Sequence, residues 1–312
     1  MSETPLGLFG RVEEFPNSDA ARRLAGIVGL NDIIGRLVAD ATALLDPSLV
    51  EKWSVEHHGA VVGAVAALTS RTPLFVFAGD VGVGKTELAE VLGQAIAKHT
   101  DASVTLYPLS LTARGKGAVG EMTTLLTQAF ERVRGDFAKA RSPRTGRAAS
   151  MGILLVDEAD AIAQSREEAQ MHHEDRAGVN ALIRGIDDLR ADHFPVLTIL
   201  CTNRLDALDP AVRRRAAVVQ EFLRPDTEQR HELLVRLLGD TDLTQADIDS
   251  LTAATGPVKG REHGFTYSDI RQRLVPELVL AAYRADVPID KSLLADVLPR
   301  VPATRPFAAA PS

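Results

Sequence analysis

Short, almost continuously apolar runs alternate with helical stretches over the first two thirds of the chain. Apolar runs of this kind, rich in β-branched residues, are typical of strands buried on both faces of a parallel sheet. They occupy residues 73–78, 104–109, 151–156, 196–201 and 218–222. Because segments with helical spacing, such as 87–96 and 121–134, fall between these runs, the pattern predicts an α/β fold with a five-stranded parallel sheet flanked by helices.

The strand-like runs stop in the last third of the chain, where helical spacing continues alone. We therefore predict two domains, a large one over residues 23–223 and a small all-helical one over residues 224–298. Residues 1–22 are mixed and turn-rich, which predicts a loose N-terminal arm. Residues 299–312 are rich in proline and alanine, which predicts a disordered tail.

Length and composition agree with a protein of about two domains. The chain has 312 residues, with 35 Lys and Arg against 42 Asp and Glu, so its formal net charge is −7. This acidic balance disfavours broad binding to nucleic acid. Cys201 is the sole cysteine, which excludes an internal disulfide and fits a reducing compartment. The N-terminus lacks a signal-peptide pattern and the longest apolar run, 59–70, is too short to cross a membrane. We therefore expect a soluble cytoplasmic protein.

A glycine-rich turn follows the first apolar run. Residues 79–86 read GDVGVGKT, which fits the phosphate-loop pattern G-x-x-x-x-G-K-[ST] between a predicted strand and a predicted helix. The glycines let backbone N–H groups turn toward phosphate oxygens, and the helix N-terminus adds positive potential. The Lys85 ammonium can reach the β- and γ-phosphates. The residues predicted to bind ATP are Gly79, Val81, Gly82, Val83, Gly84, Lys85, Thr86 and Glu87.

Two acidic residues end the third apolar run. Asp157 and Glu158 directly follow residues 151–156. Asp157 can hold Mg²⁺ together with the hydroxyl of Thr86. Glu158 lies one residue further and points in a different direction, so it can polarise a water for attack on the γ-phosphate. A protein that only binds a nucleotide does not need such a base, and the pair therefore favours hydrolysis of ATP with Mg²⁺ as cofactor.

With these two motifs the chain resembles the AAA+ ATPases, whose module joins a phosphate-loop sheet domain to a small helical lid domain. The likeness extends over about residues 25–298. Residues 200–210 are similar to the strand that carries the family's sensor 1. The resemblance implies that Asn203 contacts the γ-phosphate or the attacking water, although an asparagine after a strand is also a common turn residue.

Three consecutive arginines follow the sensor-1 segment on a predicted short helix. In the family, an arginine here reaches the γ-phosphate held by the neighbouring subunit, a role that suits the permanently charged guanidinium. The resemblance places Arg215, or alternatively Arg214, at this catalytic position. It also implies that the active form is a homo-hexameric ring. A solvated basic cluster is the other interpretation of these arginines.

The predicted helical domain contains a segment that resembles the family's sensor 2. Residues 264–271 read GFTYSDIR. Where many members carry an arginine this chain has Ser268, and Arg271 lies nearby but out of register. Ser268 and Asp269 are also residues that commonly begin helices. The sensor-2 residue therefore stays open between Ser268, Arg271 and a purely structural helix start.

Two further segments resemble the branch of AAA+ proteins that remodels HORMA-domain proteins, the pachytene checkpoint type. Residues 174–187 and 209–220 carry this similarity. Small bacterial versions occur in CBASS antiphage operons, beside a HORMA protein and a cyclic-nucleotide synthase. The resemblance implies an ATP-hydrolysing remodeller that disassembles or unfolds a HORMA-domain partner, with the synthase as a further candidate partner.

Residues 111–121 match the segment where many AAA+ unfoldases place an aromatic pore-loop pair. The matching pair here is Ala118 and Val119, which lacks an aromatic ring to grip a chain. Arg114 and Lys116 offer charge instead. The same basic residues also suit phosphate contacts. An AAA+ ATPase acting on nucleic acid, of clamp-loader or transposition-regulator type, therefore stays an alternative, as does a nucleotide-dependent scaffold or switch.

Overall fold

The computed structural model describes residues 7–109, 121–138, 148–161 and 173–307. The chain divides into two compact units, of which the first comprises Met1–Gly26, Asn31–Ala78 and Thr86–Glu221, and the second Ile27–Leu30, Gly79–Lys85 and Phe222–Ser312. Most of the phosphate loop thus clusters with the C-terminal third of the chain rather than with the sheet. The predicted pore-loop residues Arg114, Lys116, Ala118 and Val119 lie outside the described residues.

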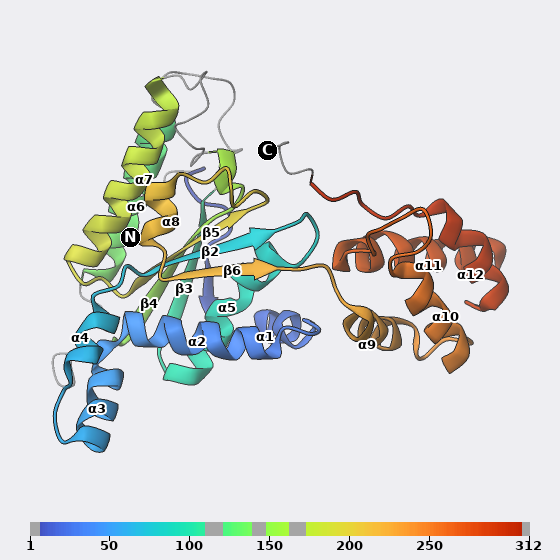
Figure 1. Ribbon diagram of the computed structural model, residues 1–312, viewed down its shortest axis with the longest axis horizontal. Coiled ribbons are helices and arrows are strands. Elements are labelled where there is room, and N and C mark those ends of the chain that lie inside the picture. Colours follow the sequence, from blue (N-terminus) through green and yellow to red (C-terminus); the bar gives the residue numbers. More distant parts are fainter. Residues whose placement is uncertain (1–6, 110–120, 139–147, 162–172, 308–312) are drawn as a thin grey trace. The chain divides into compact units, whose positions relative to one another are not determined.

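A six-stranded sheet forms the centre of the first unit (Figure 1). Its strands are β1 Glu13–Phe15, β2 Leu74–Gly79, β3 Ser103–Leu109, β4 Ser150–Val156, β5 Val196–Thr202 and β6 Val218–Phe222, in the order β1-β3-β4-β5-β2-β6. The strands β3, β4, β5 and β2 run parallel, and β1 pairs antiparallel with β3. The predicted α/β fold with its parallel sheet is confirmed. The predicted count of five strands is wrong, because β1 adds an edge strand.

This extra strand comes from the segment predicted to be a loose arm. Phe15 at its end is 2% exposed and packs beside Gly93. Helix α1 (Ser18–Ala25) follows, and its first turn is capped by Asn17, whose Oδ1 accepts the N–H of Ala20 at 2.8 Å. From residue 13 onward the segment is therefore ordered structure. A three-residue strand is too short to leave a periodic pattern, which is why the sequence does not reveal it.

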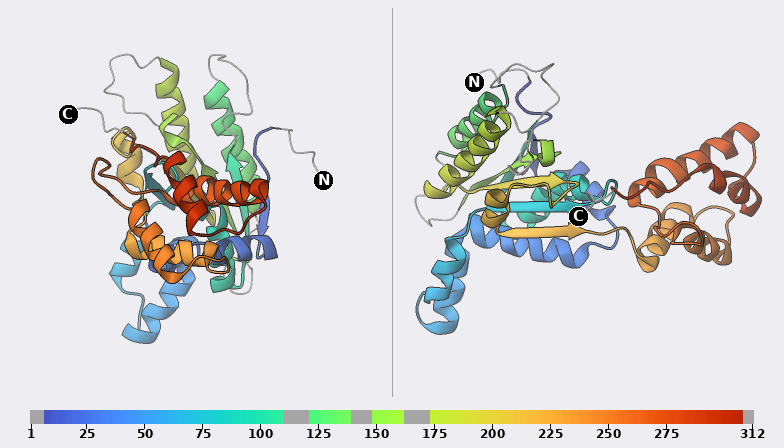
Figure 2. Two further views of the ribbon diagram at one scale, coloured as in Figure 1. Left: turned by 90° about the vertical axis from the view of Figure 1, so that its right-hand side faces the viewer. Right: turned by 45° about the horizontal axis from the view of Figure 1, so that its top comes forward.

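Helices cover both faces of this sheet. Besides α1 they are α2 Asn31–Leu45, α3 Pro47–His58, α4 Gly63–Thr69, α5 Lys85–Thr100, α6 Glu121–Phe137, α7 His173–Ala191 and α8 Pro210–Arg215. On one face α6 and α7 lie side by side (Figures 1 and 2) and share a core with Val76, Leu154 and Leu200. Side chains alternate along a strand, so the fully buried Phe75 and Phe77 face the other side, where α5 and α2 pack. None of the described helices is long and apolar enough to span a membrane.

The C-terminal helices form a core of their own in the second unit. They are α9 Thr227–Leu238, α10 Gln245–Thr255, a π-helical turn Asp269–Leu274, α11 Val275–Ala285 and α12 Lys291–Val297. Leu233, Leu251 and Leu278 are buried in this core, and Val28 from the segment Ile27–Leu30 packs with them. The all-helical region expected after the sheet domain is therefore present.

The segment after α12 differs from the disordered tail that its composition predicts. Val301 is 7% exposed in the core of the second unit. Thr304 donates its N–H and its hydroxyl to the Asp269 carboxylate, at 3.0 and 2.6 Å. These bonds join residues 35 positions apart, and composition carries no information about such distant partners. Residues 308–312 of the predicted tail lie outside the described residues.

Candidate active site

Two predicted metal-binding residues meet at the carboxyl edge of the sheet in the first unit. Asp157 directly follows β4, whose last residue Val156 is aligned with Leu200 of the parallel strand β5. Thr86 lies in the first turn of α5, and its hydroxyl donates to Asp157 Oδ2 at 3.0 Å. The fold thus brings together two side chains that are 71 positions apart in the sequence.

The chemistry of this pair fits Mg²⁺. A hydroxyl and a carboxylate are hard oxygen donors, and Mg²⁺ is commonly held by one or two protein groups while waters and substrate phosphates complete its shell. Thr86 and Asp157 are both partly exposed, so neither is sealed off from an incoming nucleotide.

The backbone turns sharply at Glu158. This residue has φ of +52°, a left-handed conformation that is uncommon for a residue with a side chain. Its N–H donates to Asp157 Oδ1 at 2.9 Å, and its own side chain is exposed. The turn separates the roles of the two acids, because Asp157 contacts Thr86 while Glu158 faces solvent. Strained backbone of this kind is concentrated at functional sites.

Asp160 holds the predicted sensor-1 residue in place. Its Oδ1 accepts the hydroxyl of Thr202 at 3.0 Å and the N–H of Asn203 at 3.4 Å. The strand end that carries Asn203 is thereby fixed to the turn that follows Asp157. Sequence reasoning missed Asp160, although its place three residues after Asp157 was a visible signal.

The predicted trans arginines differ in their surroundings. Arg215 donates through Nε and Nη2 to the Asp187 carboxylate, both at 3.0 Å, and through Nη1 to the carbonyl of Ala211 at 3.1 Å. The hydrogen bonds to Asp187 raise the pKa of Arg215. Arg214 is exposed on the same helix α8, and no partner for it is recorded within the described part of the chain. The structure therefore ties Arg215, but not Arg214, to its own subunit.

Glu87 has a partner on the N-terminal helix. Its Oε1 accepts from Arg23 Nε at 3.0 Å, and Arg23 also bonds to Glu90 one turn further along α5. These two bonds raise the pKa of Arg23. The side chain of Glu87 thus joins α1 to α5, and the contact with ATP predicted for Glu87 stays a prediction.

In the second unit the phosphate loop has the curled backbone that its glycines predict. Gly79, Gly82 and Gly84 all have positive φ. The Lys85 ammonium is buried within the curl and donates to the carbonyls of Gly79 and Asp80 at 3.0 and 2.7 Å. Val83 is fully buried, whereas Val81 is 44% exposed. Within the loop, Val81 is therefore exposed to solvent, whereas the side chains of Val83 and Lys85 are buried.

The sensor-2 segment contacts this loop directly. The N–H of Ser268 donates to the carbonyl of Gly82 at 3.1 Å. A Cβ at Gly82 would lie 2.7 Å from the Ser268 Cβ and 2.8 Å from the Thr266 hydroxyl, so only glycine fits there. Arg271, the other sensor-2 candidate, is exposed on the π-helical turn. Ser268 is thus in direct contact with the loop.

Replacing Asp269 with asparagine is expected to lower the free energy of unfolding by about 2 kcal/mol at pH 7. Burial raises the pKa of Asp269, but hydrogen bonds from Thr266, Thr304 and Arg273 outweigh it and hold the pKa below 3.8. A depressed pKa stabilises the fold above the ordinary carboxyl pKa, and this contribution is lost as pH falls through the lower folded value. Urea unfolding of both proteins between pH 7 and pH 3 tests this, and a difference that does not shrink at acid pH contradicts it.

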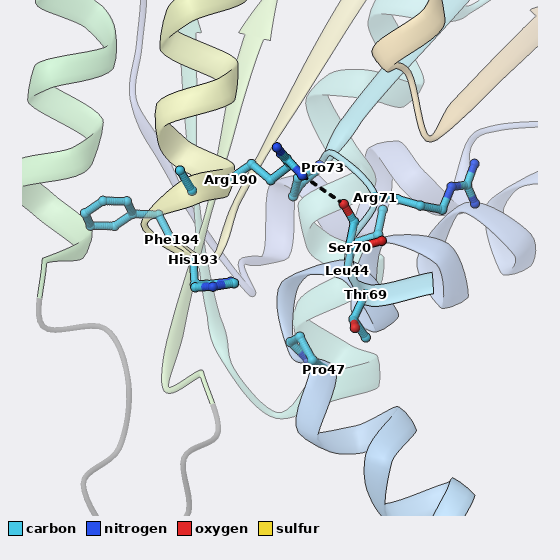
Figure 3. A pocket seen from close by; sticks show the side chains of 10 residues that line it. Leu44, Pro47, Thr69, Ser70, Arg71, Pro73, Arg190, His193 and Phe194 are labelled. Atoms are coloured by element: carbon cyan, nitrogen blue, oxygen red, sulfur yellow. Dashed lines mark hydrogen bonds between the residues drawn. The ribbon is translucent and has the colours of Figure 1, made fainter. Parts of the chain in front are cut away.

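A cleft of about 280 Å³ is lined by Pro73 and Phe194, which lie just before β2 and β5 in the sequence, and by eight further residues (Figure 3). Arg190 donates to the carbonyl of Ser70 at 3.2 Å, and Arg71 to the carbonyl of Ala217. Both guanidinium groups are therefore engaged with backbone oxygens. These bonds connect the C-terminal part of α7 with the residue after α4, and the residue Arg71 with the residue before β6. We assign no chemistry to this cleft.

Comparison with known proteins identifies relatives that match most of the chain. Residues 75–224 match the AAA family, the ATPase family associated with various cellular activities. CD-NTase-associated protein 6 of Escherichia coli strain MS 115-1 is 49% identical over 276 residues, which cover 88% of each chain. A protein of the same name from strain KTE188 is 39% identical over 280 residues, covering 88% of this chain and 90% of that one.

Two solved structures share the fold. A chain of the structure described as the E. coli MS115-1 HORMA:CdnC:Trip13 complex matches with a TM-score of 0.89 at 45% identity, over 96% of this chain and 97% of that one. Rhizobiales Trip13 matches with a TM-score of 0.73 at 39% identity, over 96% of this chain and the whole of that one. Both matches therefore include the C-terminal helical unit as well as the sheet.

Proposed function

Because the chain belongs to the family of CD-NTase-associated protein 6 and carries an AAA ATPase domain, we propose that it uses ATP hydrolysis to remodel a HORMA-domain protein. ATP hydrolysis itself follows from membership of the family. The observation that carries the choice of substrate is the solved complex described as HORMA:CdnC:Trip13, one chain of which matches this chain along 96% of its length. The proposed partners are a HORMA protein and the cyclic-nucleotide synthase that it binds, in the cytoplasm of a bacterium with a CBASS antiphage system.

The sequence motifs and the contacts of their side chains support the proposed catalytic roles. The phosphate loop binds the phosphates of ATP, with the Lys85 ammonium at the β- and γ-phosphates. Thr86 and Asp157 hold Mg²⁺, which supplies positive charge to the phosphate oxygens. Glu158 orients the attacking water and accepts its proton. Asn203, fixed through its backbone by Asp160, contacts the water or the γ-phosphate.

The proposed active form is a homo-hexameric ring in which Arg214 reaches the nucleotide of the next subunit. An arginine that acts between subunits must extend from its own chain. The guanidinium of Arg215 makes three bonds to Asp187 and one to Ala211, so moving it would cost those bonds. Arg214 is exposed on the same helix and can reach outward without such a loss. This favours Arg214 over Arg215 as the trans residue.

The predicted pore loop stays a prediction, since Arg114, Lys116, Ala118 and Val119 lie outside the described residues. We propose that this loop grips the HORMA protein through its basic residues. Movement of the helical unit during hydrolysis would then be transmitted to the loop. If basic residues of the loop grip the HORMA protein, the surface of that protein that they contact is expected to be acidic.

The proposed function predicts that the HORMA-domain partner stimulates ATP hydrolysis. Adding ATP is also expected to release that HORMA protein from its complex with the cyclic-nucleotide synthase. Steady-state ATPase assays and size-exclusion chromatography of the complex test both expectations, with Lys85→Ala as the matched variant that cannot use ATP. Stimulation by DNA that weakens with salt, without any response to the HORMA protein, would favour the nucleic-acid alternative and overturn the proposal.

A further inference from the structure

Asp80, the second residue of the phosphate loop, has contacts that the loop motif does not require. The motif accepts any residue at this position. The Asp80 carboxylate accepts the N–H of Val81 at 2.9 Å and the N–H of Phe307 at 3.1 Å. It also accepts two bonds from the guanidinium of Arg224, of which the one from Nε is 2.9 Å long. The loop therefore carries a carboxylate that is bound to residues from the far end of the chain.

Arg224 joins this carboxylate to two other parts of the second unit. Its Nη1 donates to the carbonyl oxygens of Gly264 and Thr304, at 2.7 and 2.9 Å. The side chains of Arg224 and Asp80 are only 15% and 16% exposed. Removing one partner of such a pair is costly, because the other is left with an uncompensated charge in a poorly hydrated place.

Residues 301–307, which we call the C-terminal strap, connect Asp269 with Asp80. Thr304 is held at its N–H and hydroxyl by Asp269, and at its carbonyl by Arg224. Three residues later the N–H of Phe307 reaches Asp80. The strap therefore connects the phosphate loop with Asp269 through the backbone groups of Thr304 and Phe307 and through the Thr304 hydroxyl.

The charge of Asp80 matters for a loop that receives phosphates. Burial raises the pKa of Asp80, but the bonds from Arg224, Phe307 and Val81 outweigh it and hold that pKa below its ordinary value. The carboxylate is therefore ionised at neutral pH. An uncompensated negative charge in the loop would repel the phosphates of ATP. The Arg224 guanidinium, bound through two nitrogens, cancels this charge and leaves Lys85 and the loop N–H groups to attract the ligand.

We propose that Asp80, Arg224 and the C-terminal strap form a positioning unit that prepares the phosphate loop for ATP. In this unit Arg224 neutralises Asp80, and the N–H of Phe307 fixes the carboxylate and with it the curl of the loop. The proposal rests on the proposed role of the loop in binding ATP. None of these groups acts on the reacting atoms, so their loss changes KM for ATP more than kcat.

The first test is the Arg224→Gln variant, which leaves Asp80 charged without its partner. Its KM for ATP is expected to rise roughly 10- to 100-fold, with kcat within about threefold of the parent. The double variant Asp80→Asn with Arg224→Gln removes the stranded charge and is expected to recover most of the lost affinity. Thermal unfolding of the single and double variants separates this from a purely structural role of Arg224, in which KM for ATP would change only together with the unfolding midpoint.

The second test removes one hydrogen bond from the strap and leaves Arg224 in place. Phe307→Pro deletes the N–H that Asp80 accepts, whereas Phe307→Ala keeps it and removes only the ring, which is 54% exposed. KM for ATP is expected to rise roughly three- to tenfold in the proline variant relative to the alanine variant. Both variants are assayed as full-length chains, with thermal unfolding as a check that each is folded.

An unchanged KM in the Arg224→Gln variant, or a double variant no better than the single one, overturns the proposal. Equal KM values for the two Phe307 variants overturn the role of the strap. The Lys85→Ala variant separates this failure from failure of the site itself. If Lys85→Ala binds ATP as well as the parent does, the loop is not the nucleotide site, and the premise falls rather than the positioning unit.

Discussion

Replacing Glu158 with glutamine is expected to leave ATP binding intact and to lower the steady rate of ATP hydrolysis by a factor of about 10² to 10⁴. Glutamine has nearly the same shape as glutamate, so the turn after β4 is kept, but it cannot accept a proton from the attacking water. Asp157 stays bonded to Thr86, so the residues proposed to hold Mg²⁺ are untouched. Single-turnover hydrolysis and equilibrium binding of a fluorescent ATP analogue measure the two expectations separately.

The same variant is expected to hold its protein partner in the presence of ATP. A subunit that binds nucleotide but does not hydrolyse it stays in the ATP-bound form, and the HORMA protein is then expected to co-elute with it. The Lys85→Ala variant is the control, since it is expected not to enter that form. Turnover at the rate of the parent by the Glu158→Gln protein would refute the assignment of Glu158 as the base.

Replacing Arg214 with alanine is expected to lower hydrolysis by about 10³-fold without changing the thermal unfolding midpoint. The side chain is exposed on α8, so its removal leaves no buried group without a partner. Arg215→Ala is the matched comparison on the same helix. That change strands the Asp187 carboxylate, which receives three bonds from Arg215, and it is expected to lower the unfolding midpoint measurably.

A mixing experiment shows directly whether Arg214 acts between subunits. The Arg214→Ala protein has an intact Glu158 but no arginine to offer its neighbour, and the Glu158→Gln protein has the opposite defect. When the two are co-expressed, rings that contain both include interfaces with one intact base and one intact arginine, so part of the activity is expected to return. No recovery would contradict a role of Arg214 between subunits. A large loss of activity in Arg215→Ala without a stability change would assign the role to Arg215 instead.

The motif residues of the site could be predicted because their signals are local. The phosphate loop and the pair Asp157 and Glu158 each occupy a few consecutive positions next to a strand, and the sheet edge then brings Thr86 and Asp157 together as parallel strands require. The choice between Arg214 and Arg215 was not local, because it depends on Asp187, 28 positions before Arg215. The resemblance to the family places Arg215 at the trans position, with Arg214 as the alternative.

The contacts of Asp80 that fix the phosphate loop could not be predicted from the sequence, because they too join distant positions. Asp80 meets Arg224 across 144 positions and Phe307 across 227. Within a short stretch of sequence, Asp80 is a motif position that accepts any residue, and residues 299–312 have the composition of a proline-rich tail. Strand β1 was not predicted because it has only three residues and is stabilised by pairing with β3. Long-range hydrogen bonds to single carboxylates, rather than periodicity, determine these parts of the fold.

At the left-handed turn of Glu158, the residue that would favour stability differs from the residue that the proposed hydrolysis requires. A residue with a side chain pays about 1 to 3 kcal/mol to stay in that conformation, whereas glycine adopts it at little cost. A laboratory selection that rewarded only thermal robustness would therefore be drawn toward glycine at position 158, and the proteins it enriched would have lost the proposed base. Screens for more stable forms of this ATPase need an activity step at every round.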